Sequence, residues 1–266
     1  AGQIDRRTYI NKDGLESFMF AHDNLQARNL TLFAEDLIRL TSKLNFVADA
    51  HLVYNERNSS DRFPQPDLRP WYSHMSKKYR YFRSQSTTLN QHFSAFNPSI
   101  GLIYSPFKGE DVQVFGNLSR SYEPPTFDEL VGTEVTTNIN TSPKRLYAIA
   151  LDKQTATTLE LGSKGRTTRF SWNVAAYRSW VHNEILEVKD YVRGIKRTEN
   201  YPTTLHQGVE VGLNAVVADN PWGINAGKLT LGGVYDFSDF RFSGGKYQGK
   251  RLAGIPQHYL NLSAEY

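Results

Sequence analysis

The segment 57–86, RNSSDRFPQPDLRPWYSHMSKKYRYFRSQS, is the part of the sequence best suited to binding chemistry. Guanidinium and ammonium groups bind anions, and Tyr and Trp offer flat apolar faces with a polar edge. We therefore expect an exposed binding loop for an anionic ligand. The candidate residues are Arg69, Trp71, Tyr72, Lys77, Lys78, Arg80, Tyr81 and Arg83. The alternative is that these cations solvate the loop or contact phosphates at a membrane surface.

Other residues that could bind a metal ion or a phosphate lack the spacing that such sites need. The histidine and carboxylate set His51, His92, His182 and Glu184 has no convergent spacing, so no metal site and no cofactor are expected. The glycine-rich FSGGKYQGK lacks the Gly-Lys-Ser/Thr order of a phosphate-binding loop and is expected to be a loop tip. Four carboxylates fall on the polar side of expected strands, where we expect them to line a lumen: Glu35, Asp49, Glu160 and Glu210.

Composition excludes several classes of protein. The 31 basic and 27 acidic residues give a net charge of +4, too small an excess to indicate nucleic-acid binding. There is no cysteine, which excludes disulfides and thiolate metal sites. The mean hydropathy of −0.53 and the short apolar runs exclude a spanning helix. Transmembrane strands stay possible because their alternation keeps the average low.

Alternation of apolar and polar residues predicts the elements that position these groups. In LNFVADAHLVY, every second residue from Leu44 to Tyr54 is apolar, and FSWNVAAYRSW and VEVGLNAVV repeat the pattern. We expect about nine strands and no helix, with EDLIRLTSKL forming two strands around a turn. The strands are placed near 30–40, 44–56, 87–105, 111–122, 157–162, 168–187, 204–217, 229–242 and 255–266.

The connections between these strands alternate between short and long. Short turns lie near 41–43, 107–110, 163–166 and 219–227, and long polar segments lie near 57–86, 123–156, 188–203 and 243–254. Long strands, loops that alternate in length, and aromatic residues near strand ends are typical of an up-and-down transmembrane β-barrel. Those aromatic residues are Tyr54, Tyr104, Tyr122, Trp180, Phe237 and Tyr266. A soluble β-sandwich shows the same alternation, so the pattern alone does not exclude that fold.

Three passages add a resemblance to a known family. DVQVFGNLSRSYEPPTFDEL resembles the barrel signature of TonB-dependent outer-membrane receptors, and TLFAEDLIRLTSKLNFVADAHLVY and ATTLELGSKGRTTRFSWNVAAYRSWVHNEI resemble two of its hairpins. The resemblance covers nearly all of residues 28–266. Within the family, the sequence most resembles the receptors for ferric chelates. The signature residues are Ser119, Arg120, Tyr122, Glu123, Pro124, Phe127, Glu129 and Leu130.

The resemblance implies an all-β, antiparallel fold: part of a 22-stranded barrel closed by a plug domain. It implies uptake of a ferric siderophore or similar chelate at the bacterial outer membrane, energised by TonB, with iron present only in the transported chelate. It also implies contact with outer-membrane lipid and lipopolysaccharide, and no enzymatic activity. The sequence shows neither a plug nor a TonB box, so we expect residues 1–266 to be a middle-to-late piece of the barrel, with both partners outside this chain.

Two other classes are kept as alternatives. A soluble β-sandwich or propeller would bind glycans through aromatic loops. An all-β hydrolase would need two carboxylates converging across a cleft, which no spacing here demands.

Overall fold

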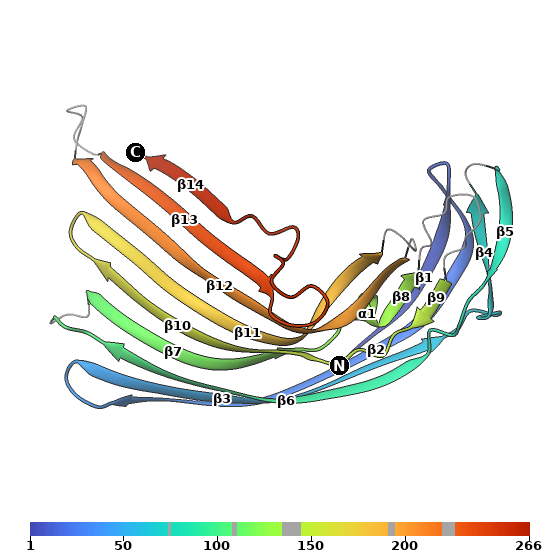
Figure 1. Ribbon diagram of the computed structural model, residues 1–266, viewed down its shortest axis with the longest axis horizontal. Helices are drawn as coiled ribbons and strands as arrows, with labels where there is room; N and C mark the ends of the chain where they lie inside the picture. The colour runs from blue at the N-terminus through green and yellow to red at the C-terminus, as the bar shows by residue number, and fades with distance from the viewer. Residues whose placement is uncertain (74–75, 108–110, 135–144, 191–194, 220–226) are drawn as a thin grey trace.

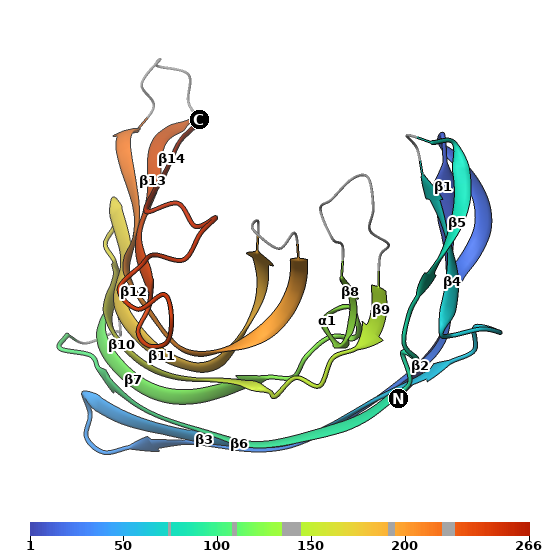
Figure 2. The ribbon, with the colours of Figure 1, turned by 45° about the vertical axis from the view of Figure 1, so that its right-hand side comes forward.

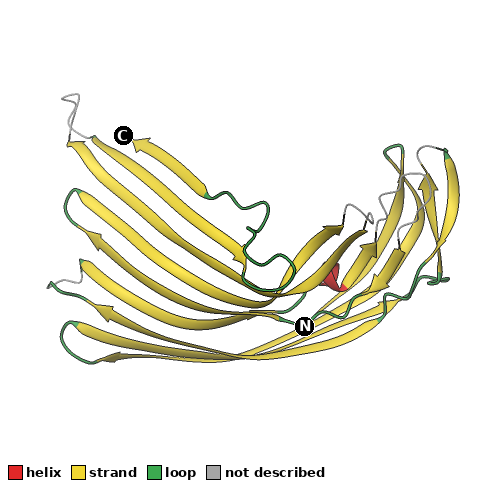
Figure 3. Ribbon diagram, in the orientation of Figure 1, coloured by secondary structure: helices red, strands yellow, loops and turns green. Residues whose placement is uncertain are grey.

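The computed structural model describes residues 1–73, 76–107, 111–134, 145–190, 195–219 and 227–266 (Figure 1). The described residues form strands and one four-residue helix (Figure 3). The elements are β1 (Gly2–Lys12), β2 (Leu15–Arg39), β3 (Leu44–Asp61), β4 (Leu68–Ser73), β5 (Lys78–Arg83), β6 (Leu89–Tyr104), β7 (Val112–Glu123), α1 (Phe127–Leu130), β8 (Val131–Glu134), β9 (Arg145–Ala148), β10 (Gln154–Arg166), β11 (Phe170–Asp190), β12 (Ile195–Asp219), β13 (Lys228–Phe242) and β14 (His258–Glu265). No described helix has the length and apolar character needed to cross a membrane.

One antiparallel sheet of ten strands dominates the fold, in the order β1-β2-β3-β6-β7-β10-β11-β12-β13-β14. Each main strand pairs with the next one along the chain, and β4–β5 and β8–β9 are small hairpins within two of the loops. The sheet curves into an open trough whose edges do not meet (Figures 1 and 2). The predicted antiparallel up-and-down arrangement is confirmed, with one more strand in the sheet than expected.

The register places the predicted apolar residues on a single face of the sheet, which we call the apolar belt. Leu32 pairs with Leu52, Phe46 with Leu102, and Val211 with Tyr235. No second sheet covers this face among the described residues, and the side chains of Leu161 and Leu262 are 58% and 74% exposed. This single layer contradicts the β-sandwich alternative, in which these residues would be buried between two sheets.

The strands cross the apolar belt at an angle. One row of paired residues runs through Ala48, Ile100, Leu118, Leu159, Arg178, Gln207 and Asp239. The row starts in the middle of the belt on β3 and ends at a charged residue beyond the belt on β13. The belt thus shifts by about one residue per strand, which gives a tilt of roughly 35° for ~3.3 Å per residue and ~4.8 Å between strands. Tilts of this size are typical of barrels that cross a membrane.

Two glycines on the polar face accept an aromatic ring from the neighbouring strand. Phe115 pairs with Gly162, and Tyr177 pairs with Gly208. A Cβ atom on Gly162 would lie 2.4 Å from the Phe115 ring. The ring therefore fills the space that a side chain would take, which pins the register of β7 on β10.

Several strands continue well beyond the apolar belt, on the side opposite the short turns. We call residues 2–27, 55–61, 182–190 and 195–203 the extension. β1 was not predicted, and segment 188–203, expected as a loop, is mostly strand, since β11 reaches Asp190 and β12 begins at Ile195; residues 191–194 lie outside the described part. The β1–β2 turn uses positive φ at Asp13 (53°) and Gly14 (91°), the conformation of a tight hairpin turn.

The sheet divides between β6 and β7, at the middle of the belt on β6 and at the end of the belt on β7. The β3–β6 pairing continues to Ser59 and Leu89, whereas the β6–β7 pairing ends at Ser99 and Ser119. Pro98, the next residue of β6, has no N–H to donate to a neighbouring strand. The short β8–β9 hairpin and α1 lie at this division (Figure 2).

Candidate ligand-binding mouth and polar wall

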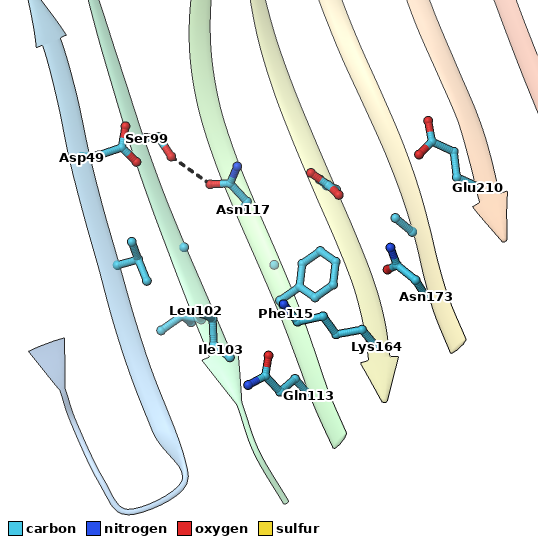
Figure 4. A pocket seen from close by; sticks show the side chains of 15 residues that line it. Asp49, Ser99, Leu102, Ile103, Gln113, Phe115, Asn117, Lys164, Asn173 and Glu210 are labelled. Atoms are coloured by element: carbon cyan, nitrogen blue, oxygen red, sulfur yellow. Dashed lines mark hydrogen bonds between the residues drawn. The ribbon is translucent and has the colours of Figure 1, made fainter. Parts of the chain in front are cut away.

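The polar face opposite the belt carries a hollow of about 450 Å³ (Figure 4). Its lining comes from strands β3, β6, β7, β10, β11 and β12, and Ser99 donates a hydrogen bond to Asn117 Oδ1 at 3.1 Å. Three of the four carboxylates expected on polar faces line it, namely Asp49, Glu160 and Glu210, together with Lys164. This wall presents donors and acceptors to a hydrated surface.

The carboxylates of this wall are spread too widely for paired acid–base chemistry. Glu160 lies on β10 and Glu210 on β12, with β11 between them. Two inter-strand spacings and a stagger along the strands separate them by roughly 10 Å or more. That exceeds the separation of a carboxylate pair that hydrolyses glycosides, so this pair offers no support for the hydrolase alternative.

The predicted binding segment 57–86 folds as the end of β3 followed by the β4–β5 hairpin. Its exposed candidate cations are on β5 and the turn before it. Lys77, Lys78, Arg80, Tyr81 and Arg83 are exposed, and Trp71 is half-buried. The ammonium of Lys77 lies 3.1 Å from Asp13 Oδ1, and this hydrogen bond and charge raise the Lys77 pKa above its usual value.

Two of the eight candidate residues are buried inside the hairpin's own packing. Arg69 is fully buried, and its guanidinium pairs with Asp61 and donates to the Phe20 carbonyl at 2.9 Å. Tyr72 is 3% exposed and packs against Tyr79, with ring centroids 5.1 Å apart. Arg69 therefore holds the hairpin against the extension, and Tyr72 packs the two strands of the hairpin together.

The signature SRSYEPPTFDEL forms the end of β7 and a short capped turn. β7 ends at Glu123, directly before Pro124 and Pro125, as expected from the loss of ladder donors. Thr126 then caps α1: its N–H and hydroxyl donate to Glu129 Oε2 at 2.7 and 2.9 Å. This reciprocal pattern is a capping box.

The signature turn is attached to the rest of the fold at two points. Leu130 is fully buried, and Asp128 pairs with Arg6 of β1 at 2.7 Å. Of the remaining signature residues, Ser119, Arg120 and Tyr122 lie on β7, and Phe127 opens α1. The FDEL turn therefore joins the first strand of the chain to the division between β6 and β7.

A second aromatic and basic cluster, not predicted from the sequence, lies where β12, β13 and loop 243–257 meet. The ring of Tyr201 is 4.5 Å from Phe242 and 6.0 Å from Tyr247, and its hydroxyl donates to the Gly244 carbonyl at 2.8 Å. Lys246 lies 5.2 Å above the Tyr247 ring. The loop projects into the trough (Figure 2). Its Tyr and Lys residues within FSGGKYQGK are the signal that could have identified it.

The histidines considered for a metal site are dispersed. Glu184 pairs with His206 at 3.3 Å and accepts from Thr204, whereas His51 lies near Asp49 on β3 and stacks on Phe33. No group of three or more His, Asp or Glu residues suited to a metal ion occurs in the described part of the chain.

Comparison with known proteins identifies the fold. The family model described as TonB dependent receptor-like, beta-barrel matches residues 3–266. No curated protein matches the chain.

Solved structures agree with the family model. The ferric yersiniabactin uptake receptor FyuA from Yersinia pestis matches with a TM-score of 0.63 and 12% identity, over 92% of this chain and 32% of the receptor. The copper transporter OprC matches at 0.64 and 12%, over 97% and 36%. The siderophore receptor PiuA from Acinetobacter baumannii matches at 0.57 and 14%, over 92% and 31%.

The chain thus spans about a third of the length of the solved proteins that it matches, and the described sheet forms part of a barrel wall and does not close. The family model describes receptors and not enzymes. Because that model matches nearly the whole sequence, the chain belongs to the family of TonB-dependent receptor-like β-barrels.

Proposed function

We propose that this chain supplies part of the wall and mouth of a bacterial outer-membrane receptor. The receptor takes up a ferric siderophore or similar iron chelate and is energised by TonB, with the plug domain and TonB outside this chain. The apolar belt faces lipid, the polar wall faces the plug and the passing cargo, and the extension stands outside the cell. Iron enters only as part of the transported chelate.

The observation that carries this proposal is a single sheet with one apolar and one polar face, which bears exposed cations on the β4–β5 hairpin at one end. We call that end the mouth. The belt is exposed to the surroundings, as a lipid-facing surface requires, and the extension carries the exposed cations Lys78, Arg80 and Arg83. Ferric chelates with carboxylate or catecholate groups are anionic, and guanidinium and ammonium groups bind such ligands through charge-assisted hydrogen bonds. The ferric yersiniabactin uptake receptor FyuA and the siderophore receptor PiuA share the fold.

Within the mouth, we propose that ligand contact comes from the exposed side of the β4–β5 hairpin and from the Tyr201–Tyr247 cluster. Trp71, Lys77, Lys78, Arg80, Tyr81 and Arg83 remain the proposed contacts from the sequence prediction. Arg69 and Tyr72 are assigned to holding the hairpin, because both are buried.

Uptake of radiolabelled iron tests the proposal. The complete receptor that contains this chain is expressed in a strain without its own ferric-chelate receptors and is supplied with iron-loaded siderophores of different chemical classes. We expect saturable uptake of at least one chelate that stops when TonB is deleted. Absence of uptake for all iron chelates, with uptake of an unrelated nutrient, would sink the iron assignment.

A matched pair of variants tests the mouth. Replacing Lys78, Arg80 and Arg83 together with Ala is expected to weaken chelate binding by at least ~10-fold, about 1.4 kcal/mol. The control replaces Arg39, Lys43 and Arg166, three exposed cations at the short-turn end, and should leave binding unchanged. Equal loss in both variants would contradict a specific role for the hairpin.

A further inference from the structure

Two arginines lie on the apolar face of the sheet, at the border between the belt and the extension. Arg120 pairs with Thr157 of β10, which pairs with Trp180 of β11. Arg178 pairs with Leu159, and Leu159 pairs with Leu118. Because side chains alternate between faces, both arginines share the face of these leucines and of Trp180.

A charge on a lipid-facing surface is tolerated near the interface and costly in the middle. Arginine at the bilayer midplane of a barrel costs about 2–4 kcal/mol, falling to about 0–1 kcal/mol near the interface. Given the tilt of the strands, Arg120 and Arg178 lie within about two residues of the belt's upper border. Trp180 lies at the same border, as expected for an interfacial aromatic residue.

These two arginines differ from other arginines on the same face in their charge partners. Arg28 lies 3.5 Å from Glu56, and Arg241 lies 2.9 Å from Asp239. Arg120 and Arg178 are exposed, and neither pairs with a carboxylate of the described residues. The guanidinium of Arg178 instead lies 5.4 Å from the centroid of the Trp180 ring.

The spacing of the two arginines suits one headgroup. A single strand, β10, separates β7 from β11, so the two backbones are roughly 10 Å apart. Thr157 of β10 lies between the two strands, paired with Arg120 on one side and with Trp180 on the other. Long arginine side chains can reach toward one headgroup from both strands. Leu118 and Leu159, which are 43% and 40% exposed, lie below them and offer an apolar surface for acyl chains.

We propose that Arg120 and Arg178, supported by Thr157 and Trp180, bind the phosphate of a phosphorylated lipid headgroup in the outer leaflet. Two unpaired guanidinium groups offer forked donors to phosphate oxygens, which is the geometry that arginine provides best. The inference rests on the proposed membrane location, and it is independent of which chelate is transported.

The test measures lipid binding to the complete purified receptor in detergent by native mass spectrometry. The probes are lipid A and its dephosphorylated form. We expect Arg120→Gln with Arg178→Gln to weaken lipid A binding by at least ~10-fold and to leave binding of the dephosphorylated lipid unchanged. The control variant, Arg28→Gln with Arg241→Gln, removes the same charge from the same face and should retain lipid A binding.

Each other outcome is informative. Equal lipid A binding by the Arg120/Arg178 variant and the unaltered receptor overturns the proposal, as does equal loss in the control variant. Arg120→Lys with Arg178→Lys keeps both charges and is expected to recover part of the binding. The receptor with Arg120→Gln and Arg178→Gln should still take up iron. If the unaltered receptor takes up no iron chelate, that result rejects the proposed function and leaves the lipid-binding proposal to its own test.

Discussion

Asp23 of β2 and Asp61 of β3 lie directly opposite each other in the sheet, and the side chain of each is 1% exposed. Two buried carboxylates facing each other repel unless cations and donors neutralise them. Arg69 pairs with Asp61, Arg6 lies 3.5 Å from Asp23, and Thr87 donates its hydroxyl to Asp23 and its N–H to Asp61. The segment between β3 and β6 is thereby fixed at both ends to the extension.

Removing Arg69 should release that segment. Arg69→Met leaves Asp61 buried without its cation, and breaking such a buried pair costs roughly 3–5 kcal/mol. We expect faster hydrogen exchange over residues 62–88 of the complete receptor and unchanged exchange at the short-turn end. The variant Arg83→Met, which removes an exposed arginine from the same hairpin, serves as the control. Similar exchange in both variants would contradict the role of the buried network.

The two faces of β6 should respond oppositely to charge. Ile100 lies in the middle of the belt, and Ser99 lies beside it on the polar face. We expect Ile100→Arg to destabilise the folded receptor in lipid vesicles by about 2–4 kcal/mol, and Ser99→Arg to have a much smaller effect. The measurement is urea-induced unfolding in vesicles. Equal destabilisation would show that the apolar face does not meet lipid.

The Phe115–Gly162 contact predicts that adding a methyl group at Gly162 lowers the stability of the fold, whereas adding one at Gly212 does not. In Gly162→Ala the new Cβ meets the Phe115 ring at 2.4 Å and the Val174 carbonyl at 2.7 Å, so we expect a loss of roughly 1–3 kcal/mol. At Gly212 the nearest neighbour of a Cβ is 3.8 Å away, so Gly212→Ala should be neutral or slightly stabilising. Thermal unfolding in detergent measures the stability of both variants, and an equal change in the two would contradict the prediction. Phe115→Leu in the Gly162→Ala background should recover part of the loss.

Acid should loosen the β1–β2 hairpin through Asp5. Its carboxylate accepts a hydrogen bond from His22 at 2.6 Å and lies 3.0 Å from Arg7, which holds the Asp5 pKa below its usual 3.8. A carboxyl whose folded pKa is lowered stabilises the fold above its unfolded pKa, and this contribution is lost as the pH falls through the folded pKa. Hydrogen exchange in the hairpin should therefore quicken as the pH falls below the usual Asp pKa of 3.8, after correction for the intrinsic rate. Asp5→Asn should lose this added acid sensitivity; a response equal to that of the unaltered chain would refute it.

Alternation predicted the parts of the strands that carry the apolar belt and missed the parts beyond it. Leu44–Tyr54 alternates because one face is apolar and the other is wet, so the strand was placed correctly. Gly2–Lys12 lies beyond the belt, and its few apolar residues, Ile4, Tyr9 and Ile10, do not alternate regularly with polar ones. The Asp13-Gly14 turn after this strand is the sequence signal that could have revealed the hairpin.

The sequence predicted a basic and aromatic segment, and the structure shows which of its residues are exposed and which are buried. Composition identified the basic and aromatic segment 57–86, but a sequence does not distinguish a cation in solvent from one opposite a buried carboxylate. Arg69 and Arg83 look alike in the sequence, and burial separates them. The Tyr201–Tyr247 contact joins residues that are distant in the chain, so local pattern did not reveal it.

The β6–β7 ladder ends next to Pro98, and this affects how the sheet can deform on the side of the extension. Below Ser99 and Ser119 the wall is continuous, so widening it would break backbone hydrogen bonds one after another. Above that point no ladder bond joins the two sides, which are connected by side-chain contacts such as the Arg6–Asp128 ion pair. The two sides can therefore move apart above Ser99 without loss of backbone pairing between them, while the paired wall below keeps a fixed width.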